Sequence, residues 1–219
     1  QLKEMLVAQG FWEVVTLSLV SRQKVSQMQI GTKEPLITIQ NPLSREQEVL
    51  RPLALSGLLD ALAHNANRKE KDLMLFEVGK RYLGGVERES LALLISGDIQ
   101  STWVNKTEAS FYYLKGVLES VYTRFNKPMP TWKPQAFLPQ TLVNAVVDGD
   151  SQNLVSFNAE LQPAVLSEWG IESKVYYAEI LLDQFFLLDE KKQSFKTLPK
   201  FPPVRRDVAI LVNESVSIA

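Results

Sequence analysis

The sequence of 219 residues contains no cysteine and only one histidine, His64. Without cysteine the chain can form neither a disulfide framework nor a thiolate zinc site, and one histidine cannot build a two-histidine metal site or an imidazole acid–base network. A Walker-type phosphate loop and a Gly-x-Ser-x-Gly nucleophile motif are absent as well. The sequence therefore lacks the local signatures of several large enzyme classes.

Long apolar runs and an excess of one charge are also missing. No apolar run approaches the roughly 18 residues of a membrane-spanning helix, and no secretory pattern is visible. The 24 Lys and Arg residues nearly balance the 25 Asp and Glu residues, so the basic footprint of a dedicated nucleic-acid-binding protein is missing. With 45% apolar residues the chain can form a sizeable core. We expect a cytoplasmic globular protein that does not contact a membrane.

The spacing of apolar residues predicts several helices. The clearest covers residues 111–125, where apolar side chains recur every three or four positions. Shorter helices are expected over residues 2–9, 57–67, 163–169 and 183–188. Ser56 can cap the second of the shorter helices, and Gly10 and Gly170 can end the first and the third.

Alternation of apolar and polar residues predicts strands. Over residues 13–20, apolar Val15 and Leu17 alternate with polar Thr16 and Ser18, which is typical of a half-buried strand. Further strands are expected over residues 36–39, 49–55, 73–78, 91–95, 142–147, 154–161, 175–182 and 208–212. Because helices and strands are mixed without regular βαβ alternation, the predicted class is α+β, a mostly antiparallel sheet flanked by helices.

A proline-rich run from Pro199 to Pro203 predicts a domain boundary. We expect residues 1–196 to form the main module, and residues 197–219 to be a linker and the first strand of a truncated second domain. The last residues stop inside a strand-like run, as expected of a fragment of a longer protein. Since a lone strand lacks partners for its backbone groups, we expect it to be disordered or to pair opportunistically.

Three stretches of the sequence carry a resemblance to a known family. They are Asn41–Ser44 with Val49–Pro52, Gly57–Leu59, Asn65–Arg68 and Leu75–Lys80, then Phe111–Gly116, and finally Lys200–Asp207. In this order they resemble the beta subunit of bacterial phenylalanyl-tRNA synthetase, in which the last stretch opens a ferredoxin-fold anticodon-binding domain. The sequence departs from the family at Phe137–Thr141, where a His-Pro-Gly-Arg-like stretch is typical. No small-ligand contact is therefore carried over to those residues.

The resemblance implies a class II aminoacyl-tRNA synthetase-like fold and a module that assembles with a catalytic alpha subunit in an α2β2 heterotetramer. The holoenzyme would use ATP and Mg²⁺ to attach phenylalanine to its tRNA, whereas no catalytic residue, cofactor or metal is expected in this fragment. The resemblance also implies that the amino-terminal helix and strand face the alpha subunit. The candidate interface residues are Leu6, Phe11, Trp12, Val15 and Leu17.

The residues that would carry class II chemistry are incomplete in this sequence. Such an active site needs arginines that neutralise the phosphates of ATP, and carboxylates that hold Mg²⁺. Catalytic members carry Arg-x-Glu on a strand, but here Pro52 and Leu53 follow Arg51, and a glycine-rich motif with a terminal arginine is missing. We interpret Arg51 as an ion-paired or surface residue and His64 as a residue at the polar edge of a helix.

Two other hypotheses stay open. The chain could be an independent adenylate-forming ligase with an unrecognised active site, which predicts Mg²⁺-dependent binding of ATP. It could instead be a tRNA-binding module, which predicts strongly salt-dependent affinity. The candidate contacts to tRNA phosphate are Arg68, Lys69, Arg205 and Arg206, although these residues could also be simply solvated.

Overall fold

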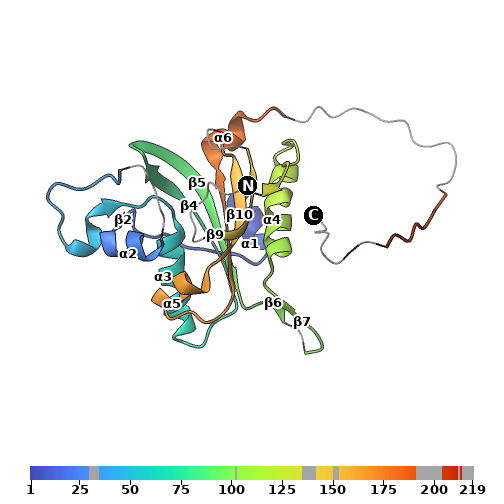
Figure 1. The fold of residues 1–219 in the computed structure, drawn as a ribbon, viewed down its shortest axis with the longest axis horizontal. Helices are drawn as coiled ribbons and strands as arrows, with labels where there is room; N and C mark the ends of the chain where they lie inside the picture. The colour runs from blue at the N-terminus through green and yellow to red at the C-terminus, as the bar shows by residue number, and fades with distance from the viewer. Residues whose placement is uncertain are drawn as a thin grey trace.

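The computed structural model describes residues 1–29, 35–101, 103–134, 142–149, 153–190, 204–211 and 213. Their main feature is a seven-stranded sheet in which all neighbouring strands run antiparallel except β1 and β4, which are parallel (Figure 1). In spatial order the strands are β1 (Trp12–Glu13), β4 (Leu73–Leu83), β5 (Val86–Ser96), β11 (Val175–Leu181), β10 (Ser156–Leu161), β9 (Leu142–Asp148) and β8 (Lys133–Pro134). The predicted α+β class with a mostly antiparallel sheet is confirmed.

Helices cover both sides of this sheet, and each side has its own apolar core (Figure 1). The α3 face is covered by α2 (Arg22–Gln27), α3 (Leu55–Ala66) and α5 (Pro163–Glu168). The α4 face is covered by α1 (Leu2–Ala8), α4 (Phe111–Arg124) and α6 (Leu182–Leu187). Because both sides are buried, the central strands need apolar residues at nearly every position, which explains their continuous apolar runs.

The hairpin of β4 and β5 forms the longest pairing in the sheet. Leu83 pairs with Val86 across a two-residue turn in which Gly84 has φ +60° and Gly85 has φ +75°. Positive φ at both central positions is the requirement of a type I′ turn, which glycine meets without steric cost. This turn lets both strands extend well beyond the predicted 73–78 and 91–95.

The amino-terminal strand differs from its prediction. In place of one strand over residues 13–20, the chain forms β1 and then β2 (Leu19–Val20), with an extended segment, residues 14–18, between them. Val15 and Leu17 are 89% and 66% exposed, so these two apolar side chains point outward, whereas Val14 is half-buried against the core. The alternating pattern indicates extended backbone, but it does not tell which of the two sets of side chains is buried.

The predicted strand over residues 49–55 is also shorter than expected. Only β3 (Val49–Leu50) forms, and it pairs with β2 in a small separate sheet. The predicted strand 36–39 is reduced to a bridge between Thr38 and Val49. Remaining elements are the 3-10 helix η1 (Arg45–Gln47) and the hairpin of β6 (Asp98–Ser101) and β7 (Lys106–Glu108).

The helix predictions are largely confirmed. Pro163 occupies the first position of α5, and Gly170 beyond its end has φ +67°. The predicted cap Ser56 is wrong, because α3 begins one residue before it and Ser56 is buried within the first turn. None of the helices among the described residues is long and apolar enough to cross a bilayer.

Residues 204–211 have no helix or strand, and their side chains are exposed. The predicted strand over 208–212 is therefore not formed by residues 208–211, while residue 212 lies outside the described part. The proline-rich run and Phe137–Thr141 also lie outside the described residues. The boundary between residues 1–196 and 197–219 stays a prediction.

Candidate functional site

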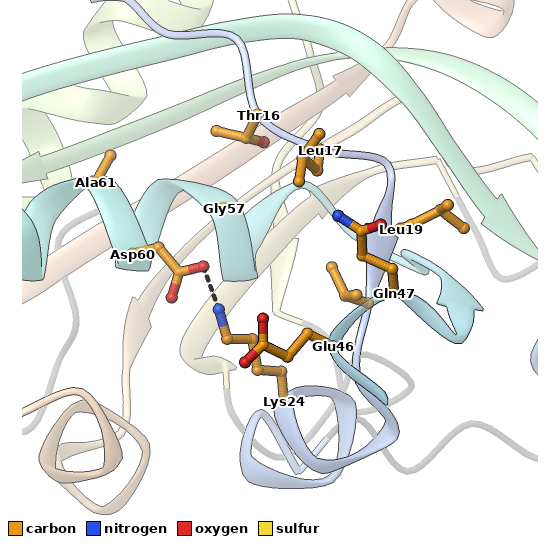
Figure 2. Close-up of a pocket in the computed structure, with 10 residues that line it drawn as sticks. Thr16, Leu17, Leu19, Lys24, Glu46, Gln47, Gly57, Asp60 and Ala61 are labelled. Atoms are coloured by element: carbon orange, nitrogen blue, oxygen red, sulfur yellow. Dashed lines mark hydrogen bonds and ion pairs between the residues drawn. The ribbon is translucent and has the colours of Figure 1, made fainter. Parts of the chain in front are cut away.

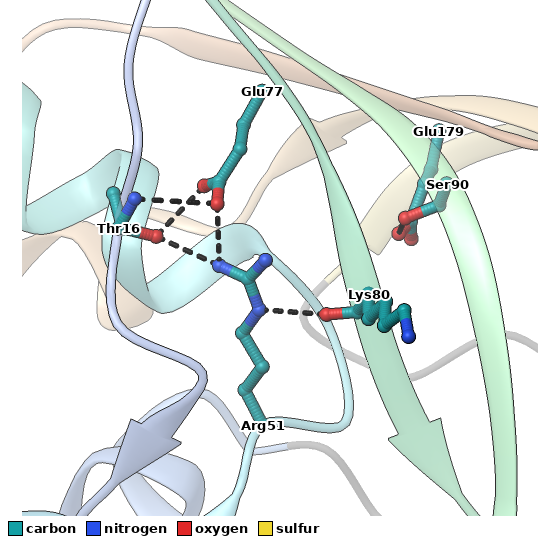
Figure 3. Close-up of polar contacts among 6 residues, drawn as sticks. All are labelled: Thr16, Arg51, Glu77, Lys80, Ser90 and Glu179. Atoms are coloured by element: carbon teal, nitrogen blue, oxygen red, sulfur yellow. Dashed lines mark hydrogen bonds and ion pairs between the residues drawn. The ribbon is translucent and has the colours of Figure 1, made fainter.

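Two buried ion pairs, Arg51 with Glu77 and Arg81 with Glu179, lie on the α3 face of the sheet. Figure 3 shows the first pair and the position of Glu179. Glu77 and Arg81 alternate with residues of the opposite face along β4, and Glu179 lies on β11. Arg51 enters from the turn that follows β3. All four charged side chains belong to residues that are at least nine-tenths buried.

Arg51 is 1% exposed and contacts two other chain segments, β4 and residues 14–18. Its Nη1 is 2.9 Å from Oε1 of Glu77. Its Nε donates a hydrogen bond of 2.9 Å to the carbonyl of Lys80. Its Nη1 also donates a 2.7 Å hydrogen bond to Oγ1 of Thr16. The buried guanidinium is thus both paired and hydrogen-bonded, as burial of a charge requires.

Thr16 completes this network from the other side. Its hydroxyl donates a 2.7 Å hydrogen bond to Oε2 of Glu77, and its backbone N–H donates a 3.3 Å bond to Oε1 of the same carboxylate. A single hydroxyl therefore accepts from Arg51 and donates to Glu77. We call Thr16, Arg51 and Glu77 the buried charge network.

Two glycines make room for the buried charge network. A Cβ at Gly57 would lie 2.2 Å from Oγ1 of Thr16, and a Cβ at Gly79 would lie 2.6 Å from Nη2 of Arg51. Neither distance is compatible with the observed positions of the side chains. The glycines at 57 and 79 are thus explained by close packing rather than by a phosphate-binding loop.

The second ion pair is centred on Glu179, which is fully buried. Its carboxylate accepts a 2.6 Å hydrogen bond from Oγ of Ser90 and lies 3.3 Å from Nη1 of Arg81. Burial, and then the negative charge of Glu179, raise the pKa of the Tyr177 hydroxyl well above its ordinary value. The negative charge here is therefore balanced by one arginine and kept away from water.

A cavity of about 380 Å³ opens beside the network, between α2, α3, η1 and residues 16–20 (Figure 2). Gly57 and Ala61 of α3 and the side chain of Leu17 contribute to its wall. Lys24 and Asp60, which also line it, form an ion pair. The charge of Lys24 is thus neutralised. The described residues contain no cluster of three His, Cys, Asp or Glu side chains that could hold a metal.

The structure separates the candidate interface residues into two groups. Leu6 and Phe11 are buried in the core of the α4 face, whereas Trp12, Val15 and Leu17 are exposed. The candidate tRNA contacts Arg68, Lys69, Arg205 and Arg206 are all exposed, and Arg68 donates a hydrogen bond to the carbonyl of His64 at the end of α3. His64 is exposed, as predicted.

Glu77, Glu179 and Thr16 were not predicted from the sequence as site residues. A signal was available for both carboxylates, because each is the only charge in an otherwise apolar strand run, residues 73–78 and 175–182. A charge within a buried strand must find a partner in the fold. The pairing of Arg51 with Glu77 agrees with the interpretation of Arg51 as an ion-paired residue.

We predict strong coupling between Arg51 and Glu77 in a double-mutant cycle. Arg51→Met should lower the free energy of unfolding by about 3–5 kcal/mol, because it leaves Glu77 buried without a partner. Arg51→Met combined with Glu77→Leu should cost clearly less than the sum of the single changes. Urea denaturation measures both quantities.

The control for this cycle is the pair of Arg88 and Asp183, whose side chains are 32% and 37% exposed. Arg88→Met should cost at most about 1 kcal/mol, because water screens a partly exposed pair. Additive effects at Arg51 and Glu77 would contradict the network as described.

Buried tyrosines should make the fold sensitive to alkaline pH. Burial raises the pKa of Tyr177 and also that of Tyr122 on α4, so both stay protonated in the folded chain above pH 10, where they ionise in the unfolded chain. Each of these tyrosines, by ionising only in the unfolded chain, should lower the free energy of unfolding by about 1.4 kcal/mol per pH unit above roughly pH 10. Tyr177→Phe should flatten this slope, and Tyr112→Phe, at an exposed site, should not. An equal slope in the Tyr177 variant would show that the hydroxyl ionises in the folded state.

Comparison with known proteins identifies the family of this chain. The family described as the phenylalanyl tRNA synthetase beta chain CLM domain matches residues 1–182. The phenylalanine–tRNA ligase beta subunit of Thermotoga maritima is 30% identical over 228 residues, covering 100% of this chain and 28% of the relative. That of Aster yellows witches'-broom phytoplasma is 31% identical, covering 99% of this chain and 26% of the relative. The chain thus spans little more than a quarter of the relatives it matches.

Among solved structures, pyrrolysyl-tRNA synthetase from Desulfitobacterium hafniense shares the fold, with a TM-score of 0.66 and 17% identity over 85% of this chain and 66% of that one. A second structure, of the synthetase PylSc from the same organism, has a TM-score of 0.63 at 16% identity, covering 85% of this chain and 63% of that one. These similarities confirm the class II synthetase-like fold. With its sequence match over residues 1–182, the chain belongs to the phenylalanyl-tRNA synthetase beta chain family, as its CLM domain.

Proposed function

We propose that this chain is a synthetase-like module without an active site of its own, which assembles with the catalytic alpha subunit of a phenylalanine–tRNA ligase. The observation that carries the proposal is the state of Arg51 and Arg81, which are buried and paired with Glu77 and Glu179. A ligase that activates an amino acid with ATP must present cationic groups to the phosphates. Arginines that balance buried carboxylates are not available for that role.

The free energy of the ion pairs supports this assignment over an independent ligase. Turning Arg51 toward a nucleotide would leave Glu77 buried without its partner. Breaking one side of a buried pair typically costs about 3–5 kcal/mol, which is equivalent to about two to four powers of ten in affinity. Binding of ATP at this position would have to overcome that cost as well as the loss of the hydrogen bonds from Arg51 to Thr16 and Lys80.

The chemistry of the holoenzyme is then assigned to its other chain. We propose that ATP and Mg²⁺ bind in the alpha subunit, that phenylalanine is attached to its tRNA there, and that the assembly is an α2β2 heterotetramer in the cytoplasm. The family membership supports the beta-subunit role, and the paired arginines support the absence of nucleotide chemistry in this module.

The proposed contact with the alpha subunit lies along the amino-terminal segment. Trp12, Val15 and Leu17 are 70%, 89% and 66% exposed and carry large apolar side chains. Exposed apolar side chains gathered on one short segment are typical of a surface that gains burial from a partner. Leu6 and Phe11 contribute indirectly, because they pack α1 and the start of β1 onto the sheet.

A contact with tRNA is a secondary part of the proposal. Arg68, Lys69, Arg205 and Arg206 are exposed and stay our candidates for contacts with phosphate groups inside the holoenzyme. The net charge of −1 does not favour a dedicated RNA-binding function for the module alone.

We predict that outward apolar residues of the amino-terminal segment are needed for association. In the full beta subunit, Val15→Ser with Leu17→Ser should weaken binding to the alpha subunit at least about tenfold, because apolar burial at the interface is lost. Analytical ultracentrifugation or a titration of one subunit with the other measures the affinity. The free energy of unfolding of the beta subunit should change little, since both residues are exposed.

The matched control replaces a valine and a leucine elsewhere on the surface. Val104 and Leu187 are 63% and 77% exposed, and their joint change to Ser should leave the affinity unchanged. Equal weakening by both double variants, or none by the first, would reject the proposed interface.

A further inference from the structure

Within residues 14–18, the positions that face solvent and the interior are reversed relative to an ordinary half-buried strand. From Val15 to Leu17 the two apolar residues face outward, and Thr16 between them faces inward, where it contacts Arg51 and Glu77. Val14 is half-buried against the core. The hydrophobic effect alone would favour the opposite orientation. Something in the fold must therefore hold the segment in this orientation.

Hydrogen bonds to the sheet and to the residues before α3 hold the segment in this orientation. The N–H of Val14 donates to the carbonyl of Phe76 at 2.9 Å, and the N–H of Thr16 donates to Glu77 at 3.3 Å. At the far end of the segment, the N–H of Arg51 donates to the carbonyl of Ser18 at 2.9 Å. Arg51 and Glu77 thus hold the segment at its central residue, Thr16. Backbone hydrogen bonds at Val14 and Ser18 hold it on either side.

Rotation of the segment by one residue would be costly for the charges beneath it. The Thr16 hydroxyl is a partner of both Arg51 and Glu77, so moving it away would remove one hydrogen bond from each buried ion. Loss of a hydrogen bond to a buried charged group is among the more expensive single defects in a protein. The absence of a side chain at Gly57 lets Thr16 reach this position.

From these contacts we infer that Thr16, Arg51 and Glu77 are positioning residues for the alpha-subunit interface: they hold Val15 and Leu17 outward. This inference rests on the proposed function, because it assigns a cause to the geometry of the proposed interface. The ion pair would then serve assembly with the alpha subunit in addition to stabilising the fold. The arginine contributes without touching the partner.

Substitutions of Thr16 test this inference in the full beta subunit. Thr16→Val keeps the shape of the side chain and removes the bridging hydroxyl, whereas Thr16→Ser keeps the hydroxyl. We expect Thr16→Val to weaken association with the alpha subunit at least about tenfold and to raise amide exchange in residues 14–18. Thr16→Ser should leave both the affinity and the amide exchange of residues 14–18 close to their wild-type values. Exchange in β4 and β5 should stay unchanged in either variant.

Gly57→Ala tests the same geometry without altering the network's own residues. Its Cβ would lie 2.2 Å from Oγ1 of Thr16, so it should displace the segment and weaken association to a similar extent. The matched control is Gly116→Ala on α4, where an added Cβ would meet no atom within 4 Å apart from its chain neighbours and the backbone of its own helix. Gly116→Ala should leave both association and exchange unchanged.

The outcomes separate this inference from the proposed function. Wild-type affinity in Thr16→Val would overturn the positioning role even if Val15 and Leu17 prove essential. Raised exchange throughout β4 and β5 would also overturn it, since it would show a role in general stability. If Val15→Ser with Leu17→Ser has no effect on association, the proposed interface fails, and unchanged exchange of residues 14–18 in Thr16→Val would then reject the network as their support.

Discussion

The buried pair of Arg51 and Glu77 is the constraint on which the amino-terminal half of the structure depends. It connects the turn after β3, the middle of β4 and the extended segment 14–18 through one guanidinium, one carboxylate and one hydroxyl. Two glycines leave the space that these side chains occupy. A buried ion pair contributes little net stability compared with an apolar replacement, but loss of one partner leaves the other charge buried and unpaired. Its effect here is to fix the positions of three segments relative to one another.

The same pairing is the basis of our proposal that this synthetase-like sheet carries no ATP site. Two arginines and two carboxylates on the α3 face neutralise each other within the core, together with Ser90 and Thr16. Apolar cores cover both sides of the sheet around these pairs. The module presents apolar side chains outward at Trp12, Val15 and Leu17, where burial can favour association with another chain.

The sequence allowed the fold class, most helices and the central strands to be predicted, because long periodic segments are local signals. It did not reveal which side of residues 13–20 is buried, since the hydrophobic pattern alone would place Val15 and Leu17 inside. That answer depends on Glu77, which is distant in sequence and approaches Thr16 only in the folded chain. Arg51 could be interpreted as ion-paired, but its partner could not be identified from spacing. The solitary charges at Glu77 and Glu179 within apolar runs were the available clue.

The central claim is that this module does not itself bind the nucleotide. The most direct measurement is a calorimetric titration of the folded chain with ATP, Mg²⁺ and phenylalanine, with the alpha subunit titrated under the same conditions. The account predicts no saturable binding of ATP to the chain, and saturable Mg²⁺-dependent binding to the alpha subunit. Saturable, Mg²⁺-dependent binding of ATP to the chain alone would contradict it and favour an independent adenylate-forming site.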